Sequence, residues 1–265
     1  MSELSPELKE FLQALEEKRE MVAMIAPSFP IVFPYPSIVG KLKRLGFTYV
    51  VEVARGAEEV NQELLKLMKA NPKARYITSP CPTIVRLIRT RHPHLIKYLA
   101  PVGSPMAMTA KLVRQKFPRC QPVFIGPCLA KKTEAREDLS DFKIIVLTHR
   151  ELQEVFRLKG LKDVPGDQII TFDIIGLPTR LYPISGGLSQ SSGLNELLTD
   201  EEYDVVSGPK LSEEVLNEFE KSRLKLLDIL YCDGGCINGP GIASQDSTEQ
   251  RRLKVLAHWT RAIKE

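Results

Sequence analysis

The sequence predicts an α/β fold made of two α/β lobes, with mostly parallel sheets and flanking helices. Short, nearly continuous apolar runs alternate with segments of helical periodicity, beginning with residues 21–25, 37–45, 48–53 and 57–70. Several runs end in turns rich in proline or glycine, and parallel sheets place their binding sites beyond the carboxyl ends of the strands. We therefore expect an active-site cluster in a cleft between the two lobes.

The order of the elements divides the chain into one lobe at about 20–120 and a second at about 121–240. A helix starts at Ser5-Pro6-Glu7, with serine as the N-cap and proline at the first helical position. Further strands are predicted at 74–78, 122–125, 143–147, 169–172, 203–206 and 226–231. Further helices are predicted at 83–99, 104–117, 149–158, 186–198, 212–221 and 247–264. The whole chain is expected to form a single catalytic domain.

Composition and charge exclude several classes of protein. The 37 basic and 33 acidic residues give a net charge of +4, which is not typical of a nucleic-acid-binding surface. No apolar run approaches the roughly 20 residues of a membrane span. Acidic residues near the N-terminus argue against a secretion signal. Five cysteines in a chain of 265 residues favour a reduced, cytoplasmic protein that binds a metal over a disulfide-bonded one.

Four of the five cysteines lie in turns rich in glycine or proline that follow predicted strands: Cys81, Cys128, Cys232 and Cys236. Four thiolates are the ligands of iron–sulfur clusters, and small neighbouring residues let the backbone approach the cluster. The close Cys-x-x-Cys pairs typical of structural zinc sites are absent from the sequence. The spacing alone leaves open whether the four thiols bind a cluster or are buried structural cysteines. Cys120 is expected to be a structural or surface thiol.

Three segments that contain these cysteines resemble, in order, the signature segments of [FeFe]-hydrogenases. They are Thr78-Ser79-Pro80-Cys81-Pro82, Gly126-Pro127-Cys128-Leu129-Ala130-Lys131-Lys132 and Cys232-Asp233-Gly234-Gly235-Cys236. The likeness runs from about residue 21 to 241 and includes Ile25-Ala26-Pro27-Ser28 and Thr148-His149-Arg150-Glu151-Leu152. The resemblance implies an oxidoreductase that interconverts H₂ with protons and electrons.

The resemblance also implies a cofactor, the H-cluster. In that family, a [4Fe–4S] cubane is joined through one thiolate to a two-iron subcluster that carries CO, cyanide and dithiolate ligands. By resemblance, Cys236 bridges the two parts, and the cubane ligands are Cys81, Cys128, Cys232 and Cys236.

Other residues are expected to contact the two-iron subcluster. Lys131 matches a lysine that hydrogen-bonds one cyanide, although a solvent-exposed lysine is the simpler interpretation. Pro27 and Ser28 are expected to meet the other cyanide. Gly186 and Gly187 are expected to allow close approach to the cluster.

One departure from the family pattern concerns proton transfer. The family has a cysteine that relays protons at the position of Pro80, and proline has no proton to give. Because fast H₂ turnover needs a positioned proton donor, we expect slow catalysis. Two alternatives stay open: an H₂- or redox-sensing H-cluster protein with low turnover, and a [4Fe–4S] electron-transfer protein that lacks the two-iron subcluster.

The resemblance further implies protein partners. No cysteine precedes Cys81, so electrons are expected to come from a ferredoxin or another small electron carrier. Hydrogenase maturation proteins are expected to supply the cluster. Basic residues at 41–44 or 131–132 are candidates for steering an acidic carrier. No nucleic-acid or membrane partner is expected.

Overall fold

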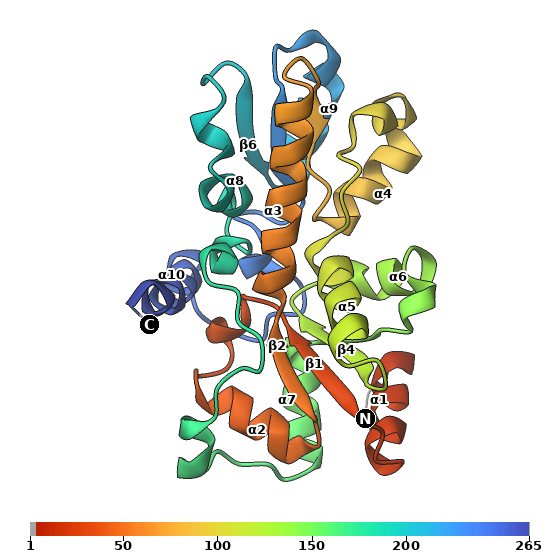
Figure 1. Ribbon diagram of the computed structural model, residues 1–265, viewed down its shortest axis with the longest axis vertical. Helices are drawn as coiled ribbons and strands as arrows, with labels where there is room; N and C mark the ends of the chain where they lie inside the picture. Colours follow the sequence, from red (N-terminus) through yellow and green to blue (C-terminus); the bar gives the residue numbers. More distant parts are fainter. Residues whose placement is uncertain (1–3, 265) are drawn as a thin grey trace.

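Two parallel sheets, one above the other, form the two lobes of the molecule (Figure 1). The computed structural model describes residues 4–264, with side chains described except at 195 and 262–264. In the lower sheet the strand order is β2 (Tyr49–Glu52), β1 (Met21–Ile25), β4 (Gln121–Gly126) and β5 (Ile145–Thr148). In the upper sheet the order is β3 (Tyr76–Ile77), β7 (Leu226–Leu230) and β6 (Tyr203–Ser207). All strand pairs are parallel, so the predicted fold class is confirmed.

Helices cover both faces of the lower sheet. One face packs on α1 (Pro6–Glu16), α2 (Ser37–Leu45) and α7 (His149–Leu158). The other face packs on α5 (Pro105–Lys116) and α6 (Ala130–Glu137). All five residues of β1 are buried, which explains its continuous apolar run. The Ser5 hydroxyl accepts a hydrogen bond from the backbone of Leu8, so the predicted cap of the first helix is confirmed.

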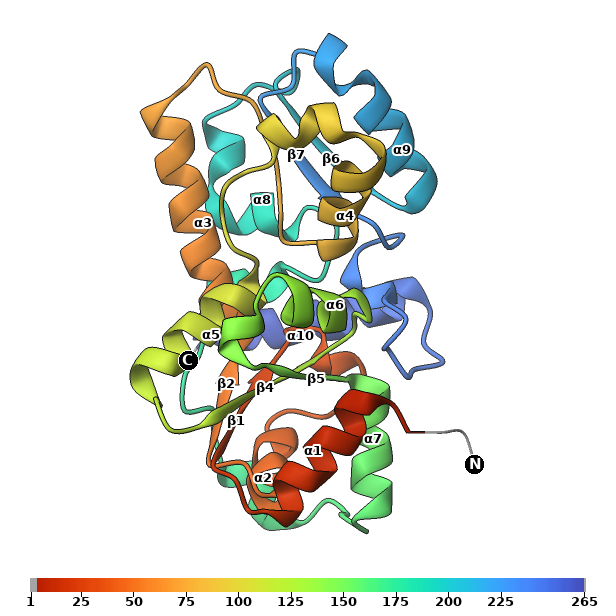
Figure 2. The same ribbon diagram turned by 90° about the vertical axis from the view of Figure 1, so that its right-hand side faces the viewer.

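The upper sheet is covered in the same way. The helices α3 (Val53–Ala70) and α8 (Gly187–Ser192) pack on one face, and α4 (Pro82–Arg91) and α9 (Pro209–Glu218) on the other. The segment expected as one helix at 83–99 is split at Pro93, where a 3-10 segment begins. The helix α3 extends from the lower sheet alongside the upper lobe, while α5, α6 and α10 (Thr248–Lys264) lie between the levels of the two sheets (Figure 2).

The two lobes are not the two halves of the chain that the sequence led us to expect. The lower sheet takes strands from 21–52 and 121–148, and the upper sheet takes strands from 76–77 and 203–230. The chain therefore crosses between the lobes more than once. Apolar patterning identifies strands but not their neighbours, and here β1 pairs with β4, about 100 residues away. The proposed boundary near residue 120 separates β1 from β4, which are adjacent in one sheet.

The strand predicted at 169–172 is absent from the described structure. Residues 165–169 form a 3-10 turn instead, which α2 contacts. The Asp167 carboxylate accepts two hydrogen bonds from the Arg44 guanidinium at 2.8 Å each. A Cβ at Gly40 would lie 2.4 Å from the Asp167 backbone, so the turn packs directly on the helix. A side-chain anchor, and not strand pairing, holds this segment.

A buried ionic network attaches the C-terminal helix to the lower sheet. Arg180 donates to Glu52 through Nε and Nη2, with the shortest contact at 2.9 Å. His258 of α10 lies 3.1 Å from Glu52 through Nε2, and its backbone oxygen accepts from Arg180. These side chains are at most 4% exposed. No helix among the described residues is long and apolar enough to cross a membrane.

Candidate metal centre

The four predicted cysteine ligands come together between the lobes. Cys81 follows β3 and caps α4, Cys128 follows β4, and Cys232 and Cys236 follow β7. Both sheets therefore contribute, each from the carboxyl ends of its strands. Burial and the neighbouring thiols Cys81 and Cys128 raise the pKa of Cys232 to about 11. Burial and the other three thiols raise the pKa of Cys236 well above its usual range.

The chemistry of the four side chains suits an iron–sulfur cluster, whose ligands are cysteine thiolates. Within residues 4–264, no group of three or more His, Cys, Asp or Glu side chains is arranged to hold one metal ion. A cubane takes its thiolates on separate irons, so its ligands stand further apart. The backbone N–H groups of Ala130 and Lys131 donate to the Cys128 sulfur. Cysteines that bind iron–sulfur clusters commonly accept hydrogen bonds of this kind. The ligand role of the four cysteines stays a prediction.

Glycines bring the cysteine-bearing loops together. A Cβ on Gly235, whose φ is +104°, would lie 2.5 Å from the Pro183 oxygen. A Cβ on Gly239 would lie 2.6 Å from the Pro127 oxygen. The Gly241 N–H donates to that oxygen at 2.8 Å. The loop after β7 thus packs directly against the loop that carries Cys128, which larger residues would prevent.

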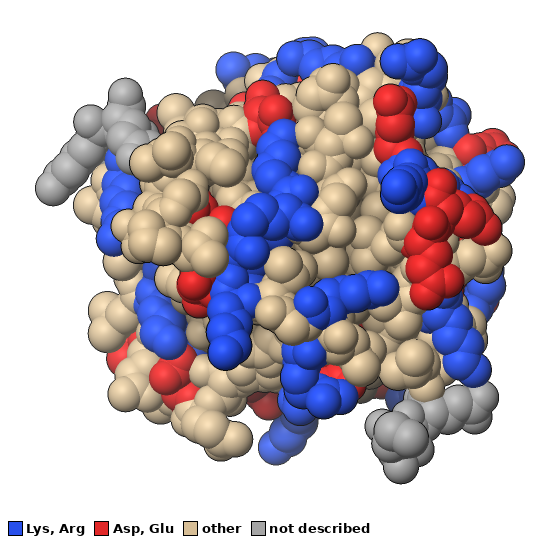
Figure 3. Space-filling view, turned by 90° about the horizontal axis from the view of Figure 1, so that it is seen from below, with Lys and Arg blue, Asp and Glu red and all other residues tan. Residues whose placement is uncertain are grey.

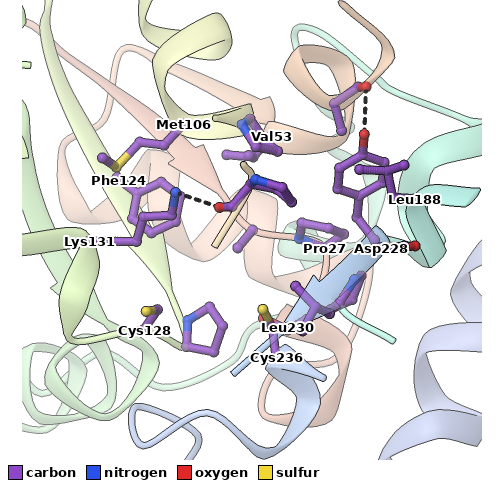
Figure 4. Close-up of a pocket in the computed structure, with 18 residues that line it drawn as sticks. Pro27, Val53, Met106, Phe124, Cys128, Lys131, Leu188, Asp228, Leu230 and Cys236 are labelled. Carbon is purple, nitrogen blue, oxygen red and sulfur yellow. Dashed lines mark hydrogen bonds between the residues drawn. The ribbon is translucent and has the colours of Figure 1, made fainter. Parts of the chain in front are cut away.

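A pocket of about 80 Å³ lies beside these cysteines (Figure 4). Cys128 and Cys236 line it, so the pocket adjoins the cysteine set. Most of the other lining residues are apolar, among them Val53, Met106 and Leu230. Polar groups at its wall include Ser28, Lys131 and Asp228.

Lys131 is buried, so the interpretation as a solvent-exposed lysine is wrong. Its residue is 7% exposed, and its ammonium lies 2.6 Å from the Glu134 carboxylate. Lys131 Nζ also donates to the Pro80 backbone oxygen at 3.3 Å, the bond drawn in Figure 4. A cation at the wall of an apolar pocket is suited to an anionic ligand. The predicted contact with cyanide is not tested.

Pro27 and Ser28 follow β1 and also line the pocket, as does Pro80. Gly186 and Gly187 are not among the lining residues. A Cβ on Gly187 would lie 1.9 Å from the Leu181 oxygen, and Gly186 has a φ of +78°. Close packing explains why glycine is needed at 187, and the left-handed backbone conformation explains it at 186. Their role toward a cluster stays a prediction.

Sequence reasoning missed two buried polar residues near the pocket. His149, the first residue of α7, lies 2.9 Å from Ser28 Oγ through Nε2 and has no exposed surface. Asp228, within β7, accepts from the Ser189 hydroxyl at 2.7 Å, and burial raises the pKa of Asp228. The sequence could have indicated Asp228, because a carboxylate inside an apolar strand is unusual. His149 lies in a segment noted for its resemblance, but nothing in the sequence indicated its partner.

The basic surfaces named as candidates for docking are neutralised. On α2, Lys41 pairs with Asp163 at 2.9 Å and Lys43 with Asp173 at 2.7 Å. Lys132 lies 2.6 Å from Glu151. Figure 3 shows the lower end of the molecule, where Lys and Arg side chains predominate across the middle and Asp and Glu gather mainly toward one side. The prediction that these residues steer an acidic carrier is not tested by the structure.

The buried His149 predicts a pH dependence of stability. Burial lowers the pKa of His149 to about 3, whereas the unfolded chain takes up the proton near pH 6.5. Between these values the unfolded state binds more protons, so the free energy of unfolding falls as the pH falls. We expect His149 to contribute about 2 kcal/mol of this loss at pH 5. Urea denaturation at pH 7.5 and at pH 5 measures this loss. Between the two pH values, His149→Gln should lose about 2 kcal/mol less free energy of unfolding than the wild type. An equal loss in the two proteins would show that His149 is not the group that titrates.

An α/β fold with four cysteines beyond the carboxyl ends of its strands is typical of a protein that binds an iron–sulfur cluster. Residues 19–240 match the family model described as the iron only hydrogenase large subunit, C-terminal domain. The chain belongs to that family.

Curated relatives and solved structures point in different directions. The chain is 28% identical over 187 residues to the cytosolic Fe-S cluster assembly factor NAR1 of Encephalitozoon cuniculi, covering 62% of the chain and 51% of the relative. It is 30% identical over 158 residues to NAR1 of Yarrowia lipolytica, covering 56% and 30%. The chain thus spans about half the length of these relatives, or less.

Among solved structures, a variant of the [FeFe]-hydrogenase HydA1 from Chlamydomonas reinhardtii superposes with a TM-score of 0.72 at 18% identity, covering 92% of the chain and 88% of that structure. A HydA(deltaEFG) structure, described as revealing stepwise H-cluster assembly, gives 0.67 at 17%, covering 97% and 93%. At this identity the likeness shows the fold alone.

Proposed function

We propose that the chain is an iron–sulfur oxidoreductase of the [FeFe]-hydrogenase type that interconverts H₂ with protons and electrons. The observation that carries the proposal is the mostly apolar pocket beside Cys128 and Cys236, with buried Lys131 at its wall. A [4Fe–4S] cubane without the two-iron subcluster needs four thiolates, but it needs neither an adjoining pocket nor a cation at the wall of that pocket. The four cysteines would hold the cubane, and two of them, Cys128 and Cys236, line the pocket.

The residues of the chain supply binding and exclusion of water at this site. When bound, the H-cluster supplies electron storage and H₂ activation. Lys131 would donate to an anionic ligand, while Met106 and Leu230 keep the pocket apolar, which strengthens such a charge-assisted bond. A ferredoxin-like carrier, maturation proteins and a cytoplasmic location accompany this proposal.

Infrared spectroscopy tests the proposal. After anaerobic maturation with the two-iron subcluster, the protein should show stretching bands of metal-bound CO and cyanide. H₂ oxidation with a dye acceptor should then be measurable. A protein with a full cubane and no such bands would refute the proposed H₂ chemistry.

Replacing Pro80 tests the proton-transfer argument. Pro80 lines the pocket and has neither a side-chain proton nor a backbone N–H. We expect Pro80→Cys to raise the H₂ oxidation rate at least about 100-fold, the lower end of general acid–base contributions. The matched control is Pro80→Ala, which removes the ring without adding a donor and should leave the rate low. Equal rates for the two variants would mean that proline does not limit proton delivery.

A second function, in iron–sulfur cluster assembly, is favoured by the names of the curated relatives and by Pro80. Here the cubane would be carried or transferred, and no proton donor would be needed at Pro80. The test is transfer of a labelled cluster to a metal-free acceptor protein. Transfer without CO or cyanide bands after maturation supports assembly; bands and H₂ oxidation without transfer support the oxidoreductase.

A further inference from the structure

His149 and Ser28 form a buried pair at the wall of the pocket. The His149 ring has no exposed surface and packs edge-on against the Phe33 ring, with centroids 5.8 Å apart. Its Nε2 lies 2.9 Å from Ser28 Oγ. Within the described side chains, His149 Nδ1 has no hydrogen-bond partner, and His149 is the one recorded partner of Ser28 Oγ. Ser28 itself lines the pocket.

The protonation state of His149 is fixed by its surroundings. The groups that face it are the Phe33 ring and the Ser28 hydroxyl, and no carboxylate or cation contacts its ring among the described residues. Burial without a charged partner lowers the pKa of His149 to about 3, so the ring is neutral at physiological pH. A neutral imidazole carries one proton, on either Nδ1 or Nε2.

The two tautomers differ in what they leave unpaired. With the proton on Nδ1, an N–H donor is buried with no acceptor, which is rare and costly in proteins. With the proton on Nε2, the ring donates to Ser28 Oγ and only an acceptor, Nδ1, stays unpaired. The Ser28 hydroxyl proton then has no acceptor on the ring. It is free to point toward the pocket, which Ser28 lines. A ligand there can accept it.

We propose that His149 is a positioning residue that donates from Nε2 to Ser28 and thereby fixes the Ser28 hydroxyl as a hydrogen-bond donor into the pocket. The ligand that suits this donor is an anionic hydrogen-bond acceptor. Lys131, from α6, is a second donor at the same pocket. The inference rests on the proposed oxidoreductase function for the identity of that ligand, a metal-bound cyanide.

The tautomer is measured without any two-iron subcluster. Nitrogen NMR of the full chain, with labelled histidines and the oxidised cubane, reports which ring nitrogen carries the proton. The His149 signal is assigned by its loss in His149→Gln and by its contact with the Phe33 ring. We expect a neutral ring with the proton on Nε2 from pH 8 to 5. A proton on Nδ1, or a ring that titrates in this range, would overturn the inference.

Infrared spectra of the matured protein test the effect on the ligand. Ser28→Ala and His149→Phe should shift the same cyanide band in the same direction, because both remove the oriented donor. His149→Gln keeps an N–H donor and should restore the wild-type position. A purely structural role would not separate phenylalanine from glutamine. An unmoved band in His149→Phe, with a shift in Ser28→Ala, contradicts the inference.

The two measurements fail separately. If matured wild-type protein gives no cyanide bands, the proposed H₂ chemistry is refuted. The role of His149 is then decided by the tautomer that nitrogen NMR reports. If the bands appear and the proton lies on Nδ1, the oxidoreductase proposal stands and the role of His149 is refuted.

Discussion

Cys236→Ser protein, purified without oxygen, is expected to contain at least about tenfold less iron than the wild type. Cys236 is both a member of the converging cysteine set and a wall residue of the pocket. Loss of an outer-shell group alone typically weakens metal binding 10- to 100-fold, and the loss of a ligand has a larger effect. Iron analysis and the visible absorbance of the cluster measure the result.

Cys120→Ser is the matched control for this experiment. Cys120 lies before β4, in a surface groove with Arg119 and Gln121, and does not line the pocket. Its iron content should equal that of the wild type. Loss of iron from this variant, or retention of a full cluster by Cys236→Ser, would show that the four ligands have been assigned wrongly.

Arg180→Met is expected to lower the free energy of unfolding by about 3–5 kcal/mol. The guanidinium is wholly buried and donates twice to Glu52 and once to the His258 backbone. Removing it leaves the Glu52 carboxylate buried, with the His258 ring and the Gly176 N–H, at 3.1 Å each, as its remaining partners among the described residues. Urea denaturation of the anaerobic protein measures the loss.

Two variants separate the buried network from the effect of losing any arginine. Arg157→Ala breaks an exposed pair with Glu154 and should cost at most about 1 kcal/mol. The double variant Glu52→Gln/Arg180→Met should recover part of the loss, because no unpaired charge is left inside. If Arg180→Met costs no more than Arg157→Ala, the network does not stabilise the attachment of α10.

The sequence was informative where local patterning decides the structure. Continuous apolar runs identified β1 and β7, Ser5 identified the start of α1, and the turns after the strands identified the four cysteines that converge. In each case the signal lies within a few residues of the feature.

The remaining features depend on partners far apart in the chain. Glu52 and Arg180 are 128 residues apart, and Ser28 and His149 are 121 apart. Neither residue of such a pair is unusual by itself, since a glutamate at a strand end or a histidine at a helix start also occurs on a surface. For the same reason the exchange of strands between the lobes was not visible in the order of the elements.

That exchange has a consequence for biosynthesis. The upper sheet places β7 between β3 and β6. Because β7 lies about 150 residues after β3, β3 cannot pair until that later strand has been synthesised. Two of the four candidate ligands directly follow β7, near the end of the chain. The chain up to the segment after β7 must therefore be synthesised before all four thiols can meet. A cluster held by all four candidate ligands could accordingly be completed only after Cys236 has been synthesised.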